Sequence, residues 1–484
     1  MDPAGPHQAG SPSPLTSRLV ADRAMAWAGP GTLGPAHAIP AVARDALPML
    51  EVDVDIDGRH RLSWARPARV LGFAGRTRAR PRRAHGRDRG RRAVRASAPS
   101  SPSEEEDHVD LAVTQEQAEL RRTVRDFLDK TSPETEVRRL METADGYDPD
   151  TWRRLAGELG VAGLTLPEEH GGAGYGFVEL GIVLEEAGRS LLCAPLLSTV
   201  VLAASTLLAL DDEQARADYL PGIAAGTTIA TLALTEAAGR WDGPDAVTTT
   251  AARGAHGWTV TGTKAHVLDG HLAALLLVAA RTDAGTSVFA VDGDAPGVHR
   301  QPRATLDQTR RQADLTFTAA PARLLGDEGA AWPALARVLD LAAVAVATEQ
   351  VGGAARVLDM AVGYAKSRVQ FGRPIGSFQA VKHKLANIHL DVETARSAAR
   401  YGLWAAAGSP PDLPLAASLA KACCGDAYVT AATENIQVHG GIGFTWEHPA
   451  HLYLKRAHSS RQLFGNAADH RQRLARQVLA EQPE

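Results

Sequence analysis

The chain has 484 residues, of which 44% are hydrophobic and 22% are charged, a balance typical of globular proteins rather than of disordered chains. Its formal net charge of −4 gives no overall electrostatic basis for binding nucleic acid. Three cysteines, Cys193, Cys423 and Cys424, exclude a disulfide framework and favour a reducing, cytoplasmic location.

The first 108 residues differ in composition from the rest of the chain. They contain 17 Arg, no Lys and 12 Asp or Glu, for a net charge of +5, and ten of the arginines lie between Arg76 and Arg95. A segment this rich in Pro, Ala, Gly and Arg cannot bury enough apolar surface to offset its ordering entropy. One interpretation is a basic arm for nucleic acid or a membrane surface. We favour a disordered or spurious extension over residues 1–108, with Val109 as the natural start.

Residues 109–228 are expected to form a helical domain. Thr114-Gln-Glu-Gln117 is a capping box that predicts a helix start. Segment 191–210 has no charged residue and is long enough to span a membrane. Because it contains Pro195 and many Ala, Ser and Thr residues, we expect a buried helix there and no integral membrane span. Helix breaks are predicted at Ser132-Pro133, at residues 166–174 and at Pro221-Gly222.

The periodicity changes at Ile229. Short apolar runs separated by Gly, Asp and Pro are typical of an antiparallel barrel or sandwich. Residues 229–327 are therefore expected to form a central antiparallel β domain. The predicted strands are Ile229–Thr235, Ala246–Ala252, Trp258–Gly262, Leu275–Ala280, Ser287–Val291 and Ala313–Thr318.

Helical periodicity returns after Pro333 and continues almost to the last residue. Residues 328–484 are expected to form a C-terminal four-helix bundle. The sequence thus predicts an α+β multidomain fold in the order helices, sheet, helices. The predicted bundle helices are Leu335–Lys366, Phe378–Ala407, Leu415–Gln437 and Pro449–Leu479.

Two connections between these helices contain residues suited to phosphate and aromatic ligands. In Arg368-Val-Gln-Phe371, arginine offers a bidentate grip on phosphate and phenylalanine a stacking surface. In Gln437-Val-His-Gly440-Gly441, paired glycines let backbone amides approach a phosphate closely. Taken alone, either segment could equally be an ordinary connection in a bundle.

The sequence lacks the phosphate loop, the Gly-x-Gly-x-x-Gly turn after a strand and the Gly-x-Ser-x-Gly elbow. Three histidines, His448, His451 and His458, share helical spacing and could lie on one face. No acidic residues lie in obvious register with them, so we expect structural histidines and no metal site.

Together, and on this architecture, the two connections resemble the acyl-CoA dehydrogenase family over roughly residues 110–480. Leu234-Thr235-Glu236, Gly262-Thr-Lys264 and Leu339-Asp340 are further matches. The resemblance implies FAD bound between domains and between subunits. It also implies proton removal from the α carbon of an acyl-CoA, hydride transfer from the β carbon to the flavin, and an electron-transfer flavoprotein as acceptor. The residues matched to the family's cofactor contacts are Thr235, Arg368, Phe371, Gln379, Gln437, Gly440 and Gly441.

The sequence departs from the family pattern at the catalytic base. The family's glutamate occupies one of two places, which are matched here by Ala342 and Phe464, and neither side chain can accept a proton. Glu349 is the best substitute because it lies seven residues past Ala342, on the same helix face. It is, however, about 10 Å further along the axis, and a carboxylate there could instead form a salt bridge within the bundle.

Other family positions have changed as well. The arginine that helps to hold CoA is matched by Ala343, and the Trp and Thr usually beside the flavin are matched by His266 and Leu268. In the flavin-facing loop, Arg240 and Trp241 replace small residues.

These losses favour the site-degenerate subunit of a heterotetrameric FAD-dependent acyl-CoA dehydrogenase whose partner chain supplies the base. One alternative is a self-sufficient homotetramer that uses Glu349. Another is a non-catalytic acyl-CoA-binding or scaffold protein, which retention of both cofactor segments disfavours.

Overall fold

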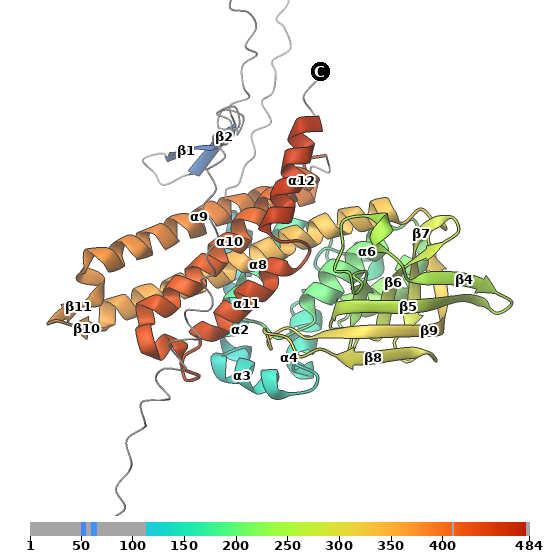
Figure 1. The fold of residues 1–484 in the computed structure, drawn as a ribbon, viewed down its shortest axis with the longest axis horizontal. Helices are drawn as coiled ribbons and strands as arrows, with labels where there is room; N and C mark the ends of the chain where they lie inside the picture. The colour runs from blue at the N-terminus through green and yellow to red at the C-terminus, as the bar shows by residue number, and fades with distance from the viewer. Residues whose placement is uncertain (1–49, 55–59, 65–112, 409–410, 481–484) are drawn as a thin grey trace, which may run out of the picture. The chain divides into compact units, whose positions relative to one another are not determined.

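A computed structural model describes residues 50–54, 60–64, 113–408 and 411–480 (Figure 1). The chain divides into two units, Met1–His108 and Val109–Glu484. In the first unit the structure describes an antiparallel pair, β1 (Leu50–Val54) and β2 (His60–Trp64), where composition predicted no regular structure. The remainder of that expectation lies outside the described residues. Within the described parts of the chain, no helix is both long and apolar enough to cross a membrane.

The second unit begins with the expected helical segment. Thr114 caps the first helix of this unit. Its hydroxyl oxygen accepts a hydrogen bond from the Gln117 backbone N–H, and the Gln117 side-chain oxygen accepts one from the Thr114 backbone N–H, so the capping box is confirmed. The charge-free segment 191–210 is buried and divided between two helical pieces. The elements are α2 (Gln115–Thr131), α3 (Glu134–Glu142), α4 (Pro149–Arg153), η2 (Arg154–Glu158), η3 (Glu168–His170), α5 (Phe177–Arg189), η4 (Leu197–Ala203), α6 (Ala204–Ala209) and α7 (Glu213–Ala224).

A seven-stranded sheet follows, and most of its ladders are antiparallel, as expected. The exceptions are β3–β6, which is parallel over four residue pairs, and β4–β6, which is parallel at the single pair Thr250 and Arg281. Strand β8 was not predicted, since its alternating exposed residues lack an apolar run. The strands are β3 (Ala230–Ala233), β4 (Thr250–Gly254), β5 (Gly257–Leu268), β6 (Leu275–Thr282), β7 (Gly285–Asp292), β8 (Val298–Pro302) and β9 (Gln312–Leu325); η5 (Pro244–Ala246) precedes β4.

The C-terminal bundle is built around α8 (Trp332–Ser367) and α10 (Leu413–His439). The predicted last helix is in fact two helices, because Phe464 and Gly465 have φ values of +56° and +92° and turn the chain between them. The remaining elements are β10 (Val369–Gln370), β11 (Arg373–Pro374), η6 (Ile375–Ser377), α9 (Gln379–Gly408), η7 (Gly440–Phe444), α11 (Ala450–Gln462) and α12 (Ala467–Ala480).

Glycines allow α8 to approach its neighbours closely. A Cβ built on Gly352 would lie 1.8 Å from the Glu185 carbonyl oxygen of α5. On the other side of α8, a Cβ built on Gly353 would lie 2.4 Å from the Tyr428 ring of α10. In Figure 1, α8 runs from the sheet at one end to the β10–β11 hairpin at the other, so this helix sets the spacing between those two regions.

Candidate active site and cofactor surface

A pocket of about 630 Å³ lies between the sheet and the first turns of α8. We call it the interdomain pocket. The segment just after β3 contributes Thr235, the bulged part of β5 contributes His266, and α8 contributes Leu339. The full lining is Leu202, Leu232, Leu234, Thr235, Gly239, Trp241, Ala265, His266, Val267, Leu268, Arg303, Ala304, Thr305, Leu306, Gln312, Leu339, His458, Ser459, Gln462, Leu463 and Phe464.

Among the described residues that line this pocket, none has a carboxylate. Phe464, at one of the two matched base positions, forms part of the wall, and Ala342, at the other, is fully buried. The proton-accepting side chains in the wall are the imidazoles of His266 and His458. Nδ1 of His266 lies 2.9 Å from Oε1 of Gln312, which fixes the plane of that ring.

The loop after β3 is anchored by a buried ion pair. Nζ of Lys264 donates to Oε1 of Glu236 at 2.6 Å and to the Leu234 carbonyl at 3.1 Å. Burial raises the pKa of Glu236, but hydrogen bonds from Lys264, Thr248 and Thr249 outweigh burial and lower it to about 2. Burial lowers the pKa of Lys264 to about 8. This pair fixes the start of the loop that carries Trp241.

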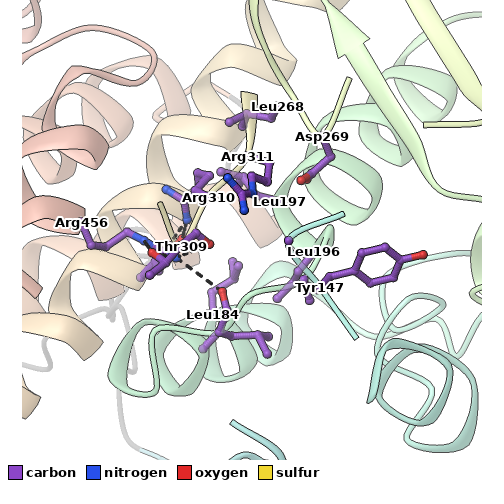
Figure 2. Close-up of a pocket in the computed structure, with 15 residues that line it drawn as sticks. Tyr147, Leu184, Leu196, Leu197, Leu268, Asp269, Thr309, Arg310, Arg311 and Arg456 are labelled. Atoms are coloured by element: carbon purple, nitrogen blue, oxygen red, sulfur yellow. Dashed lines mark hydrogen bonds and ion pairs between the residues drawn. The ribbon is translucent and has the colours of Figure 1, made fainter. Parts of the chain in front are cut away.

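Glu349 does not line the interdomain pocket and lies instead in a buried ion-pair cluster with Arg310, Arg456 and Asp307. Arg310 Nη2 donates to Glu349 Oε1 at 2.6 Å, and Arg456 Nη1 donates to the same oxygen at 2.5 Å. Arg456 Nε lies 2.9 Å from Asp307 Oδ2. Figure 2 shows Arg310 and Arg456 close to Thr309, with Leu184 below this group.

The chemistry of this cluster is that of a structural ion pair. Burial raises the pKa of Glu349, but the charges and hydrogen bonds of Arg310 and Arg456 outweigh burial and hold it below the usual value. A strongly ionised carboxylate that is already bound to two guanidinium groups is a poor proton acceptor. The adjoining cavity measures about 30 Å³, enough for roughly two water molecules and too small for an acyl chain.

The predicted cofactor residues other than Thr235 lie at the far end of the bundle. Arg368 follows the last residue of α8, and Phe371 is 91% exposed with φ +53° at the tip of the β10–β11 hairpin. Gly440 and Gly441 follow α10, and a Cβ on either would meet nothing within 4 Å. The last turns of α8, which lead into the hairpin, pack against the end of α10 through Ala361, Ala365 and Val438. Gln379 and Gln437 are exposed at this same end.

We call this end the cofactor surface; it consists of Arg368, Phe371, Gln379, Gln437, Gly440 and Gly441. It has the chemistry to hold the nucleotide part of FAD, because exposed backbone, a guanidinium and an uncovered aromatic ring lie together there. Leu339, in the interdomain pocket, and Arg368 are separated by about 29 residues of α8, or roughly 44 Å. That distance exceeds the length of one dinucleotide. The cofactor surface and the pocket of a single chain therefore cannot hold the same FAD molecule.

The three histidines considered above do not gather at one point. The rings of His448 and His439 lie 4.2 Å apart, His451 packs against Trp446, and His458 lines the interdomain pocket.

Sequence reasoning missed Arg310, Asp307 and Arg456, which come from a loop and a helix far apart in the chain. It also missed that Lys421 is buried and donates to backbone carbonyls, although a single lysine in an apolar stretch of α10 indicated a buried cation.

Models of the acyl-CoA dehydrogenase N-terminal, middle and C-terminal domains match residues 114–227, 231–319 and 329–479. Acyl-CoA dehydrogenase IpdE2 of Mycolicibacterium smegmatis is 35% identical over 368 residues, covering 76% of this chain and 100% of the relative.

Two solved structures are similar over almost their whole length. The Tcur3481–Tcur3483 steroid ACAD G363A variant has 34% identity and a TM-score of 0.69, covering 76% of this chain and 99% of that one. The ChsE4–ChsE5 complex of Mycobacterium tuberculosis has 31% identity and a TM-score of 0.71, covering 78% and 100%. With three domain matches in the order that the fold shows, this chain belongs to the acyl-CoA dehydrogenase family, FAD-binding oxidoreductases that act on CH–CH bonds.

Proposed function

We propose that this chain is the site-degenerate subunit of a heteromeric, FAD-dependent acyl-CoA dehydrogenase. The observation that supports this most strongly is the interdomain pocket, whose described lining contains no carboxylate. The nearest candidate on the family's helix face, Glu349, is held by two buried arginines. A second acyl-CoA dehydrogenase chain would supply the base.

In this proposal the chain's own residues hold the nucleotide end of an FAD whose ring lies in the partner's pocket. Arg368 binds phosphate oxygens, Phe371 stacks on an aromatic ring, and the backbone at Gly440 and Gly441 approaches the pyrophosphate. When bound, FAD supplies hydride acceptance from the β carbon of the acyl group. The 44 Å separation along α8, estimated from about 1.5 Å per residue, supports this division between subunits.

The exposed side chains at this end also support an obligate partner. Phe371, Phe444 and Trp446 are 91%, 83% and 62% exposed, an unusual amount of uncovered aromatic surface for a single chain. Two of the similar structures are named as a two-component steroid dehydrogenase and as a two-chain complex. We therefore propose a heterotetramer acting on a bulky, sterol-derived acyl-CoA, with an electron-transfer flavoprotein as acceptor.

The alternatives differ in what the chain does alone. A self-sufficient homotetramer would need Glu349 released from Arg310 and Arg456, and a scaffold protein would not need the cofactor surface. The test is the visible spectrum and native mass of the full chain, alone and co-expressed with a second acyl-CoA dehydrogenase chain of the same organism that has the family's catalytic glutamate. We expect flavin and acyl-CoA-dependent bleaching with the partner only. A yellow homotetramer that bleaches with acyl-CoA would refute the proposal, and a colourless complex would favour the scaffold.

A further inference from the structure

The interdomain pocket has a neighbour that shares one of its walls. This second pocket, of about 380 Å³, lies at the start of α8 and is lined by Trp241, Asp242, Trp332, Ala336, Leu339, Arg473, Arg476 and Gln477. We call it the arginine pocket. Trp241 and Leu339 line both pockets, so these two side chains form the partition between them.

Trp241 packs against the C-terminal bundle at Gly465. A Cβ built on Gly465 would lie 2.3 Å from Cζ2 of Trp241, so the indole occupies the space above that glycine. The ring of His470 lies 5.5 Å from the indole, centroid to centroid. Only a residue without a side chain leaves room for Trp241 here, and Gly465 also has a φ of +92°.

Hydrogen bonds from buried polar groups fix both segments that meet here, the turn at Gly465 and the loop that carries Trp241. On the bundle side, Nζ of Lys421 donates to the Gly465 carbonyl at 2.9 Å, and Nε2 of His470 lies 2.9 Å from the Phe464 carbonyl oxygen. On the sheet side, Glu236 is anchored by Lys264 at the start of the loop. Trp241 therefore bridges two fixed backbones.

The arginine pocket has the chemistry to receive a phosphorylated ligand. Arg473 Nη2 donates to Asp340 Oδ2 at 2.9 Å, which holds that guanidinium in place, and Arg476 lies one turn further along α12. The indole of Trp332 adds a stacking surface. A CoA thioester is long, with phosphates at one end and the acyl group at the other, so it would need both pockets at once.

From this arrangement we infer that Trp241 closes the chain's own passage between the arginine pocket and the interdomain pocket, and so excludes CoA thioesters from it. The inference rests on the proposed function and deepens it. The chain has lost a base and has also filled the route by which a substrate would reach the empty site. Productive binding is thereby confined to the partner's pocket.

The experiment measures binding of S-propyl-CoA, a thioether that cannot be dehydrogenated, to the full chain by isothermal titration calorimetry. We expect no measurable binding to the wild type or to Trp241→Phe, whose ring still covers Gly465. We expect Trp241→Ser to bind measurably, with a dissociation constant at least tenfold below the weakest that the titration detects. Trp404→Ser, on α9 and outside both pockets, is the matched control and should behave as the wild type. Thermal unfolding identifies any variant that fails to fold.

Binding of the probe by the wild type as tightly as by Trp241→Ser would overturn the inference. So would a folded Trp241→Ser that still fails to bind. Neither result bears on whether the chain has a catalytic base. The proposed function is tested separately, by flavin content and bleaching. Should Trp241→Ser not fold, Trp241→Leu provides the same comparison with more apolar contact retained.

Discussion

Replacement of Glu349 by Gln separates its structural role from a catalytic one. The variant keeps the shape of the side chain and removes its charge, leaving Arg310 and Arg456 with Asp307 as the remaining partner in the cluster. Glu349, Arg456 and Asp307 are 6%, 2% and 1% exposed, so water cannot replace the lost carboxylate. Breaking a buried ion pair costs about 3–5 kcal/mol.

Because the amide oxygen still accepts a hydrogen bond, we expect the lower end, about 3 kcal/mol, and a fall in the midpoint of thermal unfolding on the order of 5–10 °C. Differential scanning calorimetry of the full chain measures it. The control is Glu136→Gln, whose exposed pair with Arg139 should be worth about 1 kcal/mol or less.

The pH dependence of the same variant provides a second check. The pKa of Glu349 is lower in the folded chain than in the unfolded one, so its stabilisation is complete above the unfolded pKa. It is lost as the pH falls through the folded pKa, and the two proteins should converge in stability there. A Glu349→Gln variant as stable as the wild type, but inactive in the assembled enzyme, would refute the structural assignment and restore the catalytic one.

Three further outcomes follow from the packing and the cofactor surface. Gly352→Ala should lower the midpoint of thermal unfolding strongly, because its Cβ would collide with the backbone of α5. A Cβ on Gly363 of the same helix would meet nothing, so Gly363→Ala should raise the free energy of unfolding by about 0.5–1 kcal/mol. Calorimetry of both variants measures the two effects. Burial lowers the pKa of Lys421 to about 7, so the unfolded chain binds more protons above that pH and the free energy of unfolding should rise from pH 7 towards 10. Lys421→Met should reduce that rise in denaturant titrations and leave the contribution of Lys264, whose pKa burial lowers to about 8. A slope equal to that of the wild type would show that Lys421 does not contribute. Arg368→Ala should weaken FAD binding about tenfold or more in the assembled enzyme, through loss of a charge-assisted hydrogen bond, as read from flavin absorbance on dilution; unchanged flavin retention would contradict its assignment to phosphate.

Local sequence patterns determined much of the architecture. Three local patterns predicted the order of helical, sheet and helical domains: the capping box at Thr114, the change of periodicity at Ile229 and the return of helical spacing after Pro333. Each pattern depends on contacts within a few residues. Arg368-Val-Gln-Phe371 and the paired glycines after Gln437 were also visible, because each is a short segment with its own chemistry.

Only the tertiary structure decided what Glu349 and Trp241 contact. Glu349 is bound by Arg310 from the loop before β9 and by Arg456 from α11, which lie 39 and 107 residues away in the chain. Trp241 rests on Gly465, and no spacing in the sequence links those two positions. The physical reason is that ion pairing and steric closure depend on distances between segments that folding brings together, whereas propensity and periodicity act along the chain.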